Sequence, residues 1–516
     1  MPDILSVYAQ SQPGKLAVVD DKPDGSVVRW TYAELEAQAN RVANLLLGLG
    51  VRPGTKIIWC GPNSPEVVAV MNAARKVGAI AVPLNYRLTP EEAWYVVDNS
   101  DAEIAYVDHE HAPMFAALRD RLTKVRHMIA VGGPAPDGML GDADIAAAPS
   151  DPPDVGEAAG EGGTMIYTSG TTGKPKGAVR SGAQDPQAVG ALLNLLGYRP
   201  DDVYLTSGPL YHSGPSAFMA AGQLYGQTIV VQRKFDAEDW LRLVDKYKVS
   251  STFSAPALIR MVCALPEEVK ARYDRSSMHV MIANAAPWSY ALKQQYVANF
   301  PPESLFEVYG STELGVDTVL LPKDQLRKPG SCGQPAPGIE IKLVDDDGSE
   351  VTGTGPDHPG EVFIRSKGVF DTYYKNDASY AANSQGGYHT VGDVAYWDDE
   401  GYLYICDRKT DMIITGGMNV YPAEIEAALD QHPEIYDAAV FGIPSEEWGE
   451  AVHATVVRAP GSSLTGEEVT AFAREHLAGY KVPRSIEFAD ELPRTGSGKL
   501  LKRQLRAPYW AGQPGR

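Results

Sequence analysis

Residues 164 to 177 read TMIYTSGTTGKPKG, a short apolar run followed by a loop rich in glycine, serine, threonine and lysine. Glycines let the backbone bend so that successive N–H groups face one anion, hydroxyls add donors, and lysines supply positive charge. The loop is not a Walker A motif, because it reads GxxGK rather than GxxxxGK[ST], and Pro175 disfavours an immediate helix. The segment therefore predicts a strand leading into a polyphosphate-binding loop, with a P-loop NTPase and a plain flexible turn as weaker alternatives. The residues expected to bind phosphate are Thr168, Ser169, Gly170, Thr171, Thr172, Gly173, Lys174 and Lys176.

Helical and strand patterns alternate on the N-terminal side of this loop. Helical periodicity covers residues 32–49 and 65–77, and β-rich runs occupy 56–60 and 79–82. Such alternation predicts an α/β fold with largely parallel sheets. The stretch 132–163 is dense in Gly, Ala, Pro and Asp, and we expect it to be a surface linker.

A change of pattern predicts a domain boundary at residue 407. The β-rich residues 402–406 give way to loops, a helix expected at 422–430 and a strand expected at 438–442. We therefore predict an N-terminal domain over residues 1–406 and a compact α+β domain over residues 407–516.

The chain of 516 residues is acidic, with 46 Lys and Arg against 66 Asp and Glu, a formal net charge of -20. Such a protein repels polyanions, which disfavours nucleic-acid binding and requires local cations and N–H groups to hold any anionic substrate. The sequence shows neither a basic leader nor a run of about 18 apolar residues. We therefore expect a cytoplasmic protein without a transmembrane segment.

Cysteine and histidine spacing predicts no zinc site. The four cysteines, at positions 60, 263, 332 and 406, lie far apart and form no CxxC pair, so we expect reduced, mostly buried thiols. Residues 108–111 read DHEH, which differs from the HExxH zinc motif, and we expect an exposed polar turn there.

Further motifs follow the phosphate loop in a fixed order. They are YHSG at 211–214, YGSTE at 309–313, GD at 392–393, DRK at 407–409 and PRTGSGK at 493–499. Together with YTSGTTGKPKG at 167–177, this set resembles the signature of the adenylate-forming superfamily of acyl-CoA synthetases, luciferases and peptide-synthetase adenylation domains. The resemblance implies a large N-terminal region of stacked α/β subdomains with a distorted β-barrel and a small mobile α+β C-terminal domain. It also implies ATP, Mg2+ and CoA as cofactors.

The resemblance assigns the nucleotide site residue by residue. It implies that Tyr309 stacks on adenine, that Thr312 binds the α-phosphate, that Glu313 holds Mg2+ with Thr168, and that Asp393 and Arg408 bind the ribose. Two positions depart from the family: Val391 stands where a threonine is usual, and Asn284 stands where a glycine is usual. The remaining residues expected beside the adenine are Ala285, Ala286 and Gly310.

The same resemblance implies that the small domain moves. Lys499 would be the adenylation lysine, and Asp407 the hinge about which the small domain turns. After that rotation, Gly416 and Gly417 would line a pantetheine tunnel. A long cation on the Gly-rich loop before residue 499 suits the charge that develops at the transferring phosphorus.

The residues after YHSG indicate the substrate class. Amino-acid-activating relatives carry an aspartate in this region, whereas this chain has Ser216, Ala217, Phe218 and Met219. We therefore expect an uncharged acyl group in a pocket lined by Phe218, Met219 and Trp288, with Ala285 nearby. His212 either gates this pocket, approaches the thiol, or is a core histidine.

Several alternatives stay open at this stage. The sequence does not reveal the length of the substrate's acyl chain, so fatty, aryl and steroid-derived acids all fit. The acyl acceptor is either free CoA or a carrier-protein pantetheine, and a catalytically silent acyl-nucleotide sensor is a further reading. The oligomeric state also stays open, with a homodimer as one option.

Overall fold

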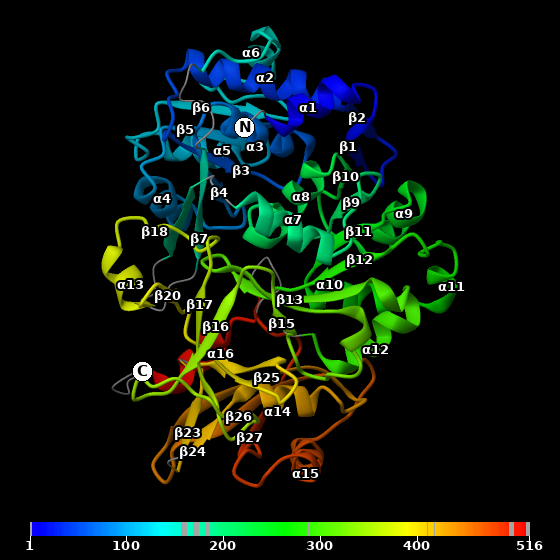
Figure 1. Ribbon diagram of the computed structural model, residues 1–516, viewed down its shortest axis with the longest axis vertical. Coiled ribbons are helices and arrows are strands. Elements are labelled where there is room, and N and C mark those ends of the chain that lie inside the picture. The colour runs from blue at the N-terminus through cyan, green and yellow to red at the C-terminus, as the bar shows by residue number, and fades with distance from the viewer. Residues whose placement is uncertain are drawn as a thin grey trace.

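The computed structural model describes residues 3–155, 162–168, 175–181, 185–286, 288–409, 411–416, 418–494 and 500–511 (Figure 1). Over these residues the strands form four sheets, three in the N-terminal part of the chain and one in the C-terminal part. The α/β fold and the separate C-terminal α+β domain predicted from the sequence are confirmed.

The first sheet contains β3 (Lys56–Cys60), β4 (Ile80–Leu84), β5 (Ile104–Asp108), β6 (His127–Val131), β7 (Gly163–Thr168), β8 (Lys176–Ser181) and β18 (Thr372–Tyr373). The helices of this part are α1 (Ile4–Ser11), α2 (Tyr32–Gly48), α3 (Pro65–Lys76), α4 (Pro90–Asn99), α5 (Ala112–Leu118) and α6 (Asp142–Ala147). Strands β4, β3, β5 and β6 are parallel neighbours, whereas β7 and β8 form an antiparallel hairpin. That hairpin carries the predicted phosphate loop.

The second sheet contains β1 (Leu16–Asp21), β2 (Val27–Thr31), β9 (Val203–Thr206), β10 (Thr228–Val231), β11 (Ser251–Ser254), β12 (Val280–Ala283), β13 (Leu305–Ser311), β14 (Gly315–Leu320) and β15 (Gln334–Pro335). Its helices are α7 (Pro186–Leu195), α8 (Ser213–Leu224), α9 (Ala237–Tyr247), α10 (Pro256–Cys263), α11 (Glu267–Lys270) and α12 (Tyr290–Asn299), with 3-10 turns η2 (Pro302–Ser304) and η3 (Pro322–Asp324). The turn between β13 and β14 carries the YGSTE motif.

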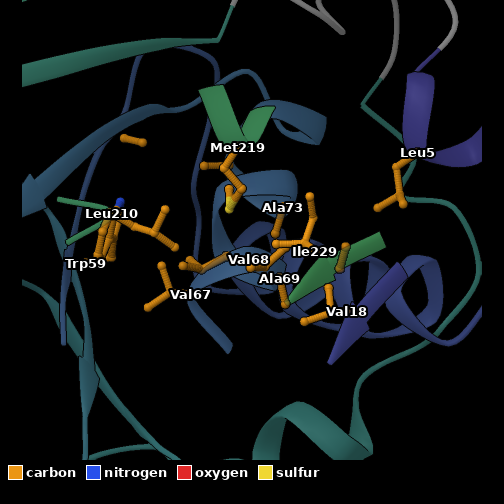
Figure 2. Close-up of a cluster of buried hydrophobic side chains, with 14 of the residues drawn as sticks. Leu5, Val18, Trp59, Val67, Val68, Ala69, Ala73, Leu210, Met219 and Ile229 are labelled. Carbon is orange, nitrogen blue, oxygen red and sulfur yellow. The ribbon is translucent and has the colours of Figure 1, made fainter. Parts of the chain in front are cut away.

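A shared hydrophobic core joins these two sheets. Figure 2 shows Met219 of α8 and Ile229 of β10 beside Val68 and Ala73 of α3, and all four are completely buried. Burying each large aliphatic side chain contributes about 1.5–3 kcal/mol. The core therefore fixes the first sheet, through α3, relative to the second sheet.

The third sheet contains β16 (Glu340–Val344), β17 (Gly360–Arg365), β19 (Ser384–Gln385), β20 (Tyr388–His389), β21 (Asp393–Trp397) and β22 (Leu403–Arg408), with α13 (Asp377–Ala382). The fourth contains β23 (Ile413–Thr415), β24 (Met418–Val420), β25 (Ile435–Ser445), β26 (Gly449–Arg458) and β27 (Ser485–Ala489), with α14 (Pro422–Leu429), α15 (Gly466–His476) and α16 (Lys502–Trp510). The fourth sheet and its helices enclose a core of their own, which includes Ile425, Val440 and Val469.

The elements predicted from periodicity agree with α2, β3, α3 and α14 to within one or two residues. β25 is longer than the predicted strand, because β26 pairs along its whole length. β22 runs to Arg408, so the predicted hinge residue Asp407 lies in a strand of the third sheet, one residue before its end.

Two surface expectations were wrong in part. The stretch 132–163 was expected to be a linker, but it contains α6, whose Ile145 is buried. Asp108, expected in an exposed turn, is 6% exposed because Arg233 binds both of its carboxylate oxygens, at 3.0 and 3.1 Å.

No helix in the described part of the chain is long and apolar enough to cross a membrane.

Candidate functional site

Thr168 and Glu313 meet where the β7–β8 hairpin approaches the β13–β14 hairpin. Thr168 Oγ1 donates to Glu313 Oε1 over 2.9 Å, and Tyr373 OH donates to the same oxygen over 3.0 Å. Glu313 is 8% exposed, a setting in which hydrogen bonds to a carboxylate are strong. The contact joins two motifs that lie 145 residues apart in the chain.

The β7–β8 hairpin fixes both ends of the predicted phosphate loop. Thr168 pairs with Lys176, so the residues between them connect the two strands. Lys176 Nζ donates to Ser379 Oγ over 3.0 Å and lies 5.4 Å from the centre of the Tyr373 ring. Lys176 thus lies beside the tyrosine that binds Glu313. The loop residues Ser169, Gly170, Thr171, Thr172, Gly173 and Lys174 lie outside the described residues, and their assignment stays a prediction.

Thr312 is held from two sides. Its Oγ1 lies 2.8 Å from Ser213 Oγ at the start of α8, and Arg180 Nη2 donates to its carbonyl oxygen over 2.9 Å. Arg180 also donates to the carbonyl oxygens of Glu313 and Gly368. The guanidinium therefore clamps the turn that presents Thr312 and Glu313.

Sequence reasoning missed Arg180 and Tyr373. Each acts on a segment that is distant in the chain, 132 residues away for Arg180 and 60 residues away for Tyr373. No motif or spacing marks either residue, because their partners Thr312 and Glu313 belong to the second sheet, whereas β8 and β18 pair with each other in the first.

A second cluster joins Tyr309, Asp393 and Arg408. Tyr309 OH donates to Asp393 Oδ2 over 2.7 Å, and Arg408 Nε lies 3.3 Å from Asp393 Oδ1. Asp393 and Arg408 are direct partners in the β21–β22 ladder, which explains why the two side chains meet. Burial and the neighbouring Asp393 raise the pKa of Tyr309 far above its usual range, so the phenol keeps its proton and remains a donor.

The hydroxyl that the family has at the position of Val391 is supplied here by the neighbouring Thr390. Thr390 is buried, its Oγ1 accepts from the Gly392 N–H over 2.9 Å, and it donates to Glu361 over 2.9 Å. A hydroxyl one residue earlier therefore braces the Gly392 turn before Asp393.

The departure at Asn284 also has a structural role. Its Nδ2 donates to the Val308 carbonyl oxygen and its Oδ1 accepts from the Ala285 N–H, so the side chain links β12 to β13. Ala285 has a φ of 75°, in the left-handed region that costs a non-glycine residue about 1–2 kcal/mol. Ala286 follows this turn. Gly310 on β13 has no room for a Cβ, which would lie 1.9 Å from the Gly315 oxygen.

His212 is the N-cap residue of α8, next to Ser213 and Thr312. Burial lowers the pKa of His212 to about 4, so the imidazole is neutral at physiological pH. Its Nε2 is buried and has no hydrogen-bond partner among the described residues, and the same holds for the hydroxyl of Tyr211, whose ring centre lies 4.4 Å away. Two adjacent polar groups are therefore available to a bound molecule.

The three residues predicted to line an acyl pocket do not lie together. Phe218 stacks on Phe253 with ring centres 5.6 Å apart, whereas Met219 is completely buried against α3 (Figure 2). Trp288 packs in a different core, edge-on to Tyr296 at 6.1 Å. The i, i+1 neighbours Phe218 and Met219 point in different directions from one helix, which is why only one of them can face a pocket.

The predicted hinge residue is tied to both parts of the chain. Asp407 accepts from the Arg408 N–H over 2.7 Å and from the Ala423 N–H at the start of α14 over 3.0 Å. Lys502 Nζ lies 3.8 Å from Asp407 and 2.9 Å from Glu426. Burial raises the pKa of Asp407 above its ordinary value, and Lys502 opposes that shift.

The segment that carries Lys499 is anchored at its ends. Arg494 and Leu500 form a β-bridge, and the Leu501 N–H donates to the Pro493 carbonyl oxygen over 2.8 Å. Lys499 itself, like Gly417, lies outside the described residues. Gly416 has a φ of 57°, and a Cβ there would lie 2.9 Å from the Trp448 ring.

The donor set around Glu313 fits a magnesium ion. Glu313 Oε2 receives no hydrogen bond from any residue that the structure describes, so it keeps its lone pairs for a cation. No cluster of three or more His, Cys, Asp and Glu occurs in the described ranges. One carboxylate together with phosphate oxygens and water is the arrangement that Mg2+ prefers in nucleotide sites.

Comparisons with known proteins match both parts of the chain. The family model for the AMP-binding enzyme matches residues 5–374, and that for the AMP-binding enzyme C-terminal domain matches residues 424–499. A feruloyl-CoA synthase from Amycolatopsis sp is 35% identical over 483 residues, which are 93% of this chain and 94% of the relative. The long-chain-fatty-acid–CoA ligase FadD13 of Mycobacterium tuberculosis is 33% identical over 516 residues, 99% of each chain.

The fold also matches a solved enzyme. The anthranilate CoA ligase AuaEII, solved in complex with anthranoyl-AMP, superposes with a TM-score of 0.89 at 28% identity and covers 98% of this chain and 96% of its own. The likeness therefore extends over every segment that carries a motif.

Proposed function

This chain belongs to the family of AMP-binding enzymes and is an AMP-forming acid–CoA ligase, and from that premise we propose that it activates an apolar carboxylic acid with Mg-ATP and passes the acyl group to CoA. The observation that carries the proposal is the contact of Thr168 with Glu313. It places the phosphate-loop strand against the turn that holds Thr312, beside the pair of Tyr309 and Asp393.

In the first step a carboxylate oxygen of the acid attacks the α-phosphorus of ATP, and the bond to the β-phosphate breaks to release pyrophosphate. The chain's own residues position the reactants: Thr312 and the phosphate loop bind phosphate oxygens, and Asp393 with Arg408 binds the ribose. Lys499 neutralises the charge that develops between the acid and the α-phosphate. When bound at Glu313, Mg2+ supplies charge screening for the phosphates.

In the second step the CoA sulfur attacks the acyl carbon and AMP leaves. The thiol must lose its proton, and the neutral His212 offers an unpartnered Nε2 to which that thiol can donate. The small domain turns about Asp407 between the steps, so that the side with Gly416 and Gly417 replaces the side with Lys499.

The substrate is an aryl or fatty acid. Helix α8, which follows its N-cap residue His212, carries no acidic residue that would pair with a substrate ammonium. Phe218 on this helix stacks on Phe253 and supplies aromatic surface. The relatives named above act on feruloyl, long-chain fatty and anthranilate groups, which supports this range without selecting within it.

A screen of free acids for ATP-dependent pyrophosphate release tests the substrate proposal. We expect aryl or fatty acids to be turned over, and saturation by an amino acid in preference to all of them would contradict the proposal. Transfer to CoA should exceed transfer to a phosphopantetheinylated carrier protein; the opposite preference would favour the fatty acid–[acyl-carrier-protein] ligase activity named for another relative.

Two variants test the proposed roles in the first step. Lys499→Ala should lower pyrophosphate release at least about a hundredfold, because one positioned charge typically contributes ~2.7–4 kcal/mol to the barrier, and it should spare thioester formation from purified acyl-adenylate. Glu313→Gln should lower pyrophosphate release and weaken its dependence on Mg2+. The control Arg503→Ala changes an exposed cation four residues beyond Lys499 and should leave both steps unchanged.

A further inference from the structure

Arg260 joins the two domains at a place away from the hinge. It lies on α10 of the large domain, and its Nη1 donates to the carbonyl oxygen of Tyr436 in the small domain. Its Nη2 lies 3.4 Å from Asp430 Oδ1, and the guanidinium lies 5.8 Å from the centre of the Tyr436 ring. The Arg260 and Asp430 side chains are 22% and 18% exposed, so the ion pair is shielded from most of the solvent.

The large domain presents Arg260 rigidly. α10 buries Ile259, Val262 and Cys263 in the core of the second sheet, which leaves Arg260 and Met261 on its outer face. The helix therefore cannot turn to follow a moving partner. Arg260 can hold the small domain only in one orientation.

The small domain presents an unfavourable charge at the same place. Asp430 is the C-cap residue of α14, where the negative end of the helix dipole destabilises a carboxylate. An arginine from the large domain offsets both negative charges. The contact is thus electrostatically specific rather than a chance meeting of surfaces.

Asp437, the residue after Tyr436, contacts the residue that precedes the Lys499 segment. Asp437 Oδ2 accepts from Arg494 Nη2 over 2.6 Å, and Arg494 forms the bridge to Leu500 that frames residues 495–499. Leu492 is buried against β25, and Leu500 packs on the same cluster. A short path of contacts therefore runs from Arg260 through Tyr436 and Asp437 to both ends of the Lys499 segment.

The orientation of the small domain turns α16, which begins three residues after Lys499, toward the large domain. Figure 1 shows α16 and β25 at the boundary between the domains, whereas β23 and β24, which flank Gly416, lie at the remote end of the small domain. The small domain thus faces the large domain with the side that carries α16 and β25, and the side that carries Gly416 is turned away.

We propose that Arg260 is a positioning residue for the adenylation step: it holds the small domain in the orientation that presents Lys499. The inference rests on the proposed two-step function. Any rotation about Asp407 separates Arg260 from Asp430 and Tyr436, so these contacts stabilise one orientation and not the other. Their loss shifts the equilibrium away from the adenylation orientation without touching the substrate.

Arg260→Ala tests this assignment, with Met261→Ala as the matched control. Met261 is the next residue on α10 and is 46% exposed. For each variant we would measure acid-dependent pyrophosphate release and, separately, thioester formation from purified acyl-adenylate and CoA. Loss of a shielded ion pair and a charged hydrogen bond should slow pyrophosphate release about tenfold and leave the thioester step unchanged or faster. Met261→Ala should change neither step.

A charge exchange separates positioning from damage to the fold. Arg260→Asp should resemble Arg260→Ala, and adding Asp430→Arg should restore part of the pyrophosphate release by re-forming the pair in reverse. An equal loss in both steps, or no loss in either, would overturn the assignment. If the wild-type enzyme releases no pyrophosphate with any of the acids tested, the proposed function is overturned, and this inference with it.

Discussion

Asp317 on β14 is a buried carboxylate with unfavourable surroundings. Its side chain is completely buried, and neither oxygen has a hydrogen-bond partner among the residues that the structure describes. Burial raises the pKa of Asp317 well above the ordinary 3.8, the nearby Asp393 raises it further, and Arg180 opposes the shift. An unpaired buried polar group costs about 1–3 kcal/mol. The sequence offers no sign of this, because an aspartate after a YGSTE motif looks like any exposed turn residue.

We expect Asp317→Val to stabilise the protein by about 1–3 kcal/mol at pH 8, because it removes the uncompensated group from a strand that favours β-branched residues. The direction in which the stability changes with pH follows from the raised pKa of Asp317. The unfolded carboxyl ionises near 3.8 while the folded one keeps its proton, so wild-type stability falls as pH rises above that value. The gain in Tm should therefore be larger at pH 8 than at pH 5. Asp317→Asn, which removes only the charge, should show a smaller gain, and a lower Tm for both variants would contradict the argument.

At the scale of elements, the sequence predicts local pieces well and their partners poorly. The helix α2 begins at Thr31 with a capping box that is readable from the TYAE sequence, and β3 is readable from its apolar run. The meeting of β7 with the β13–β14 turn is not readable, because Thr168 and Glu313 are brought together by packing between two sheets. Trp288 shows the same limit: a large apolar residue beside a motif serves equally as core or as pocket wall.

Gly333, between β14 and the third sheet, allows a test at this scale. A Cβ there would lie 2.1 Å from the Val319 carbonyl carbon, and Gly333 has a φ of 101°. We expect Gly333→Ala to push β14 away from its neighbour and cost more than about 3 kcal/mol by urea unfolding, with a loss of pyrophosphate release because β14 supports the Glu313 turn. The control is Gly330→Ala. Gly330 has a φ of 83°, and a Cβ there would have no atom nearer than 3.9 Å. It should cost only the left-handed strain of about 1–2 kcal/mol, and equal costs would contradict the steric argument.

At the scale of the whole molecule, the change of pattern near residue 407 predicts two domains, but not what holds them together. The boundary predicted from composition and periodicity, at residue 407, falls near the end of β22. The contacts that fix the orientation, such as Arg260 with Asp430, join residues 170 positions apart and leave no trace in either local sequence. The α+β character of the small domain was readable for a simpler reason: its core residues in α14 and β25 recur at helix and strand spacing.

The buried charges around the hinge give a last expectation, for the stability of the small domain within the whole protein. Lys502 lies between Glu426 and Asp407, whose pKa values are both raised by burial and lowered again by Lys502. Lys502→Met leaves two carboxylates without their cation, and breaking a buried ion cluster in this way typically costs ~3–5 kcal/mol. Because protonation of Glu426 and Asp407 relieves that cost, the loss of Tm should be large at pH 8 and smaller at pH 5. The second substitution Glu426→Gln should recover part of the loss at pH 8. Calorimetry of the full-length Lys502→Met protein should show a lower Tm for the unfolding of the small domain. If the loss of Tm is equal at pH 5 and pH 8, packing of the Lys502 stem, and not its charge, holds α16 against the hinge.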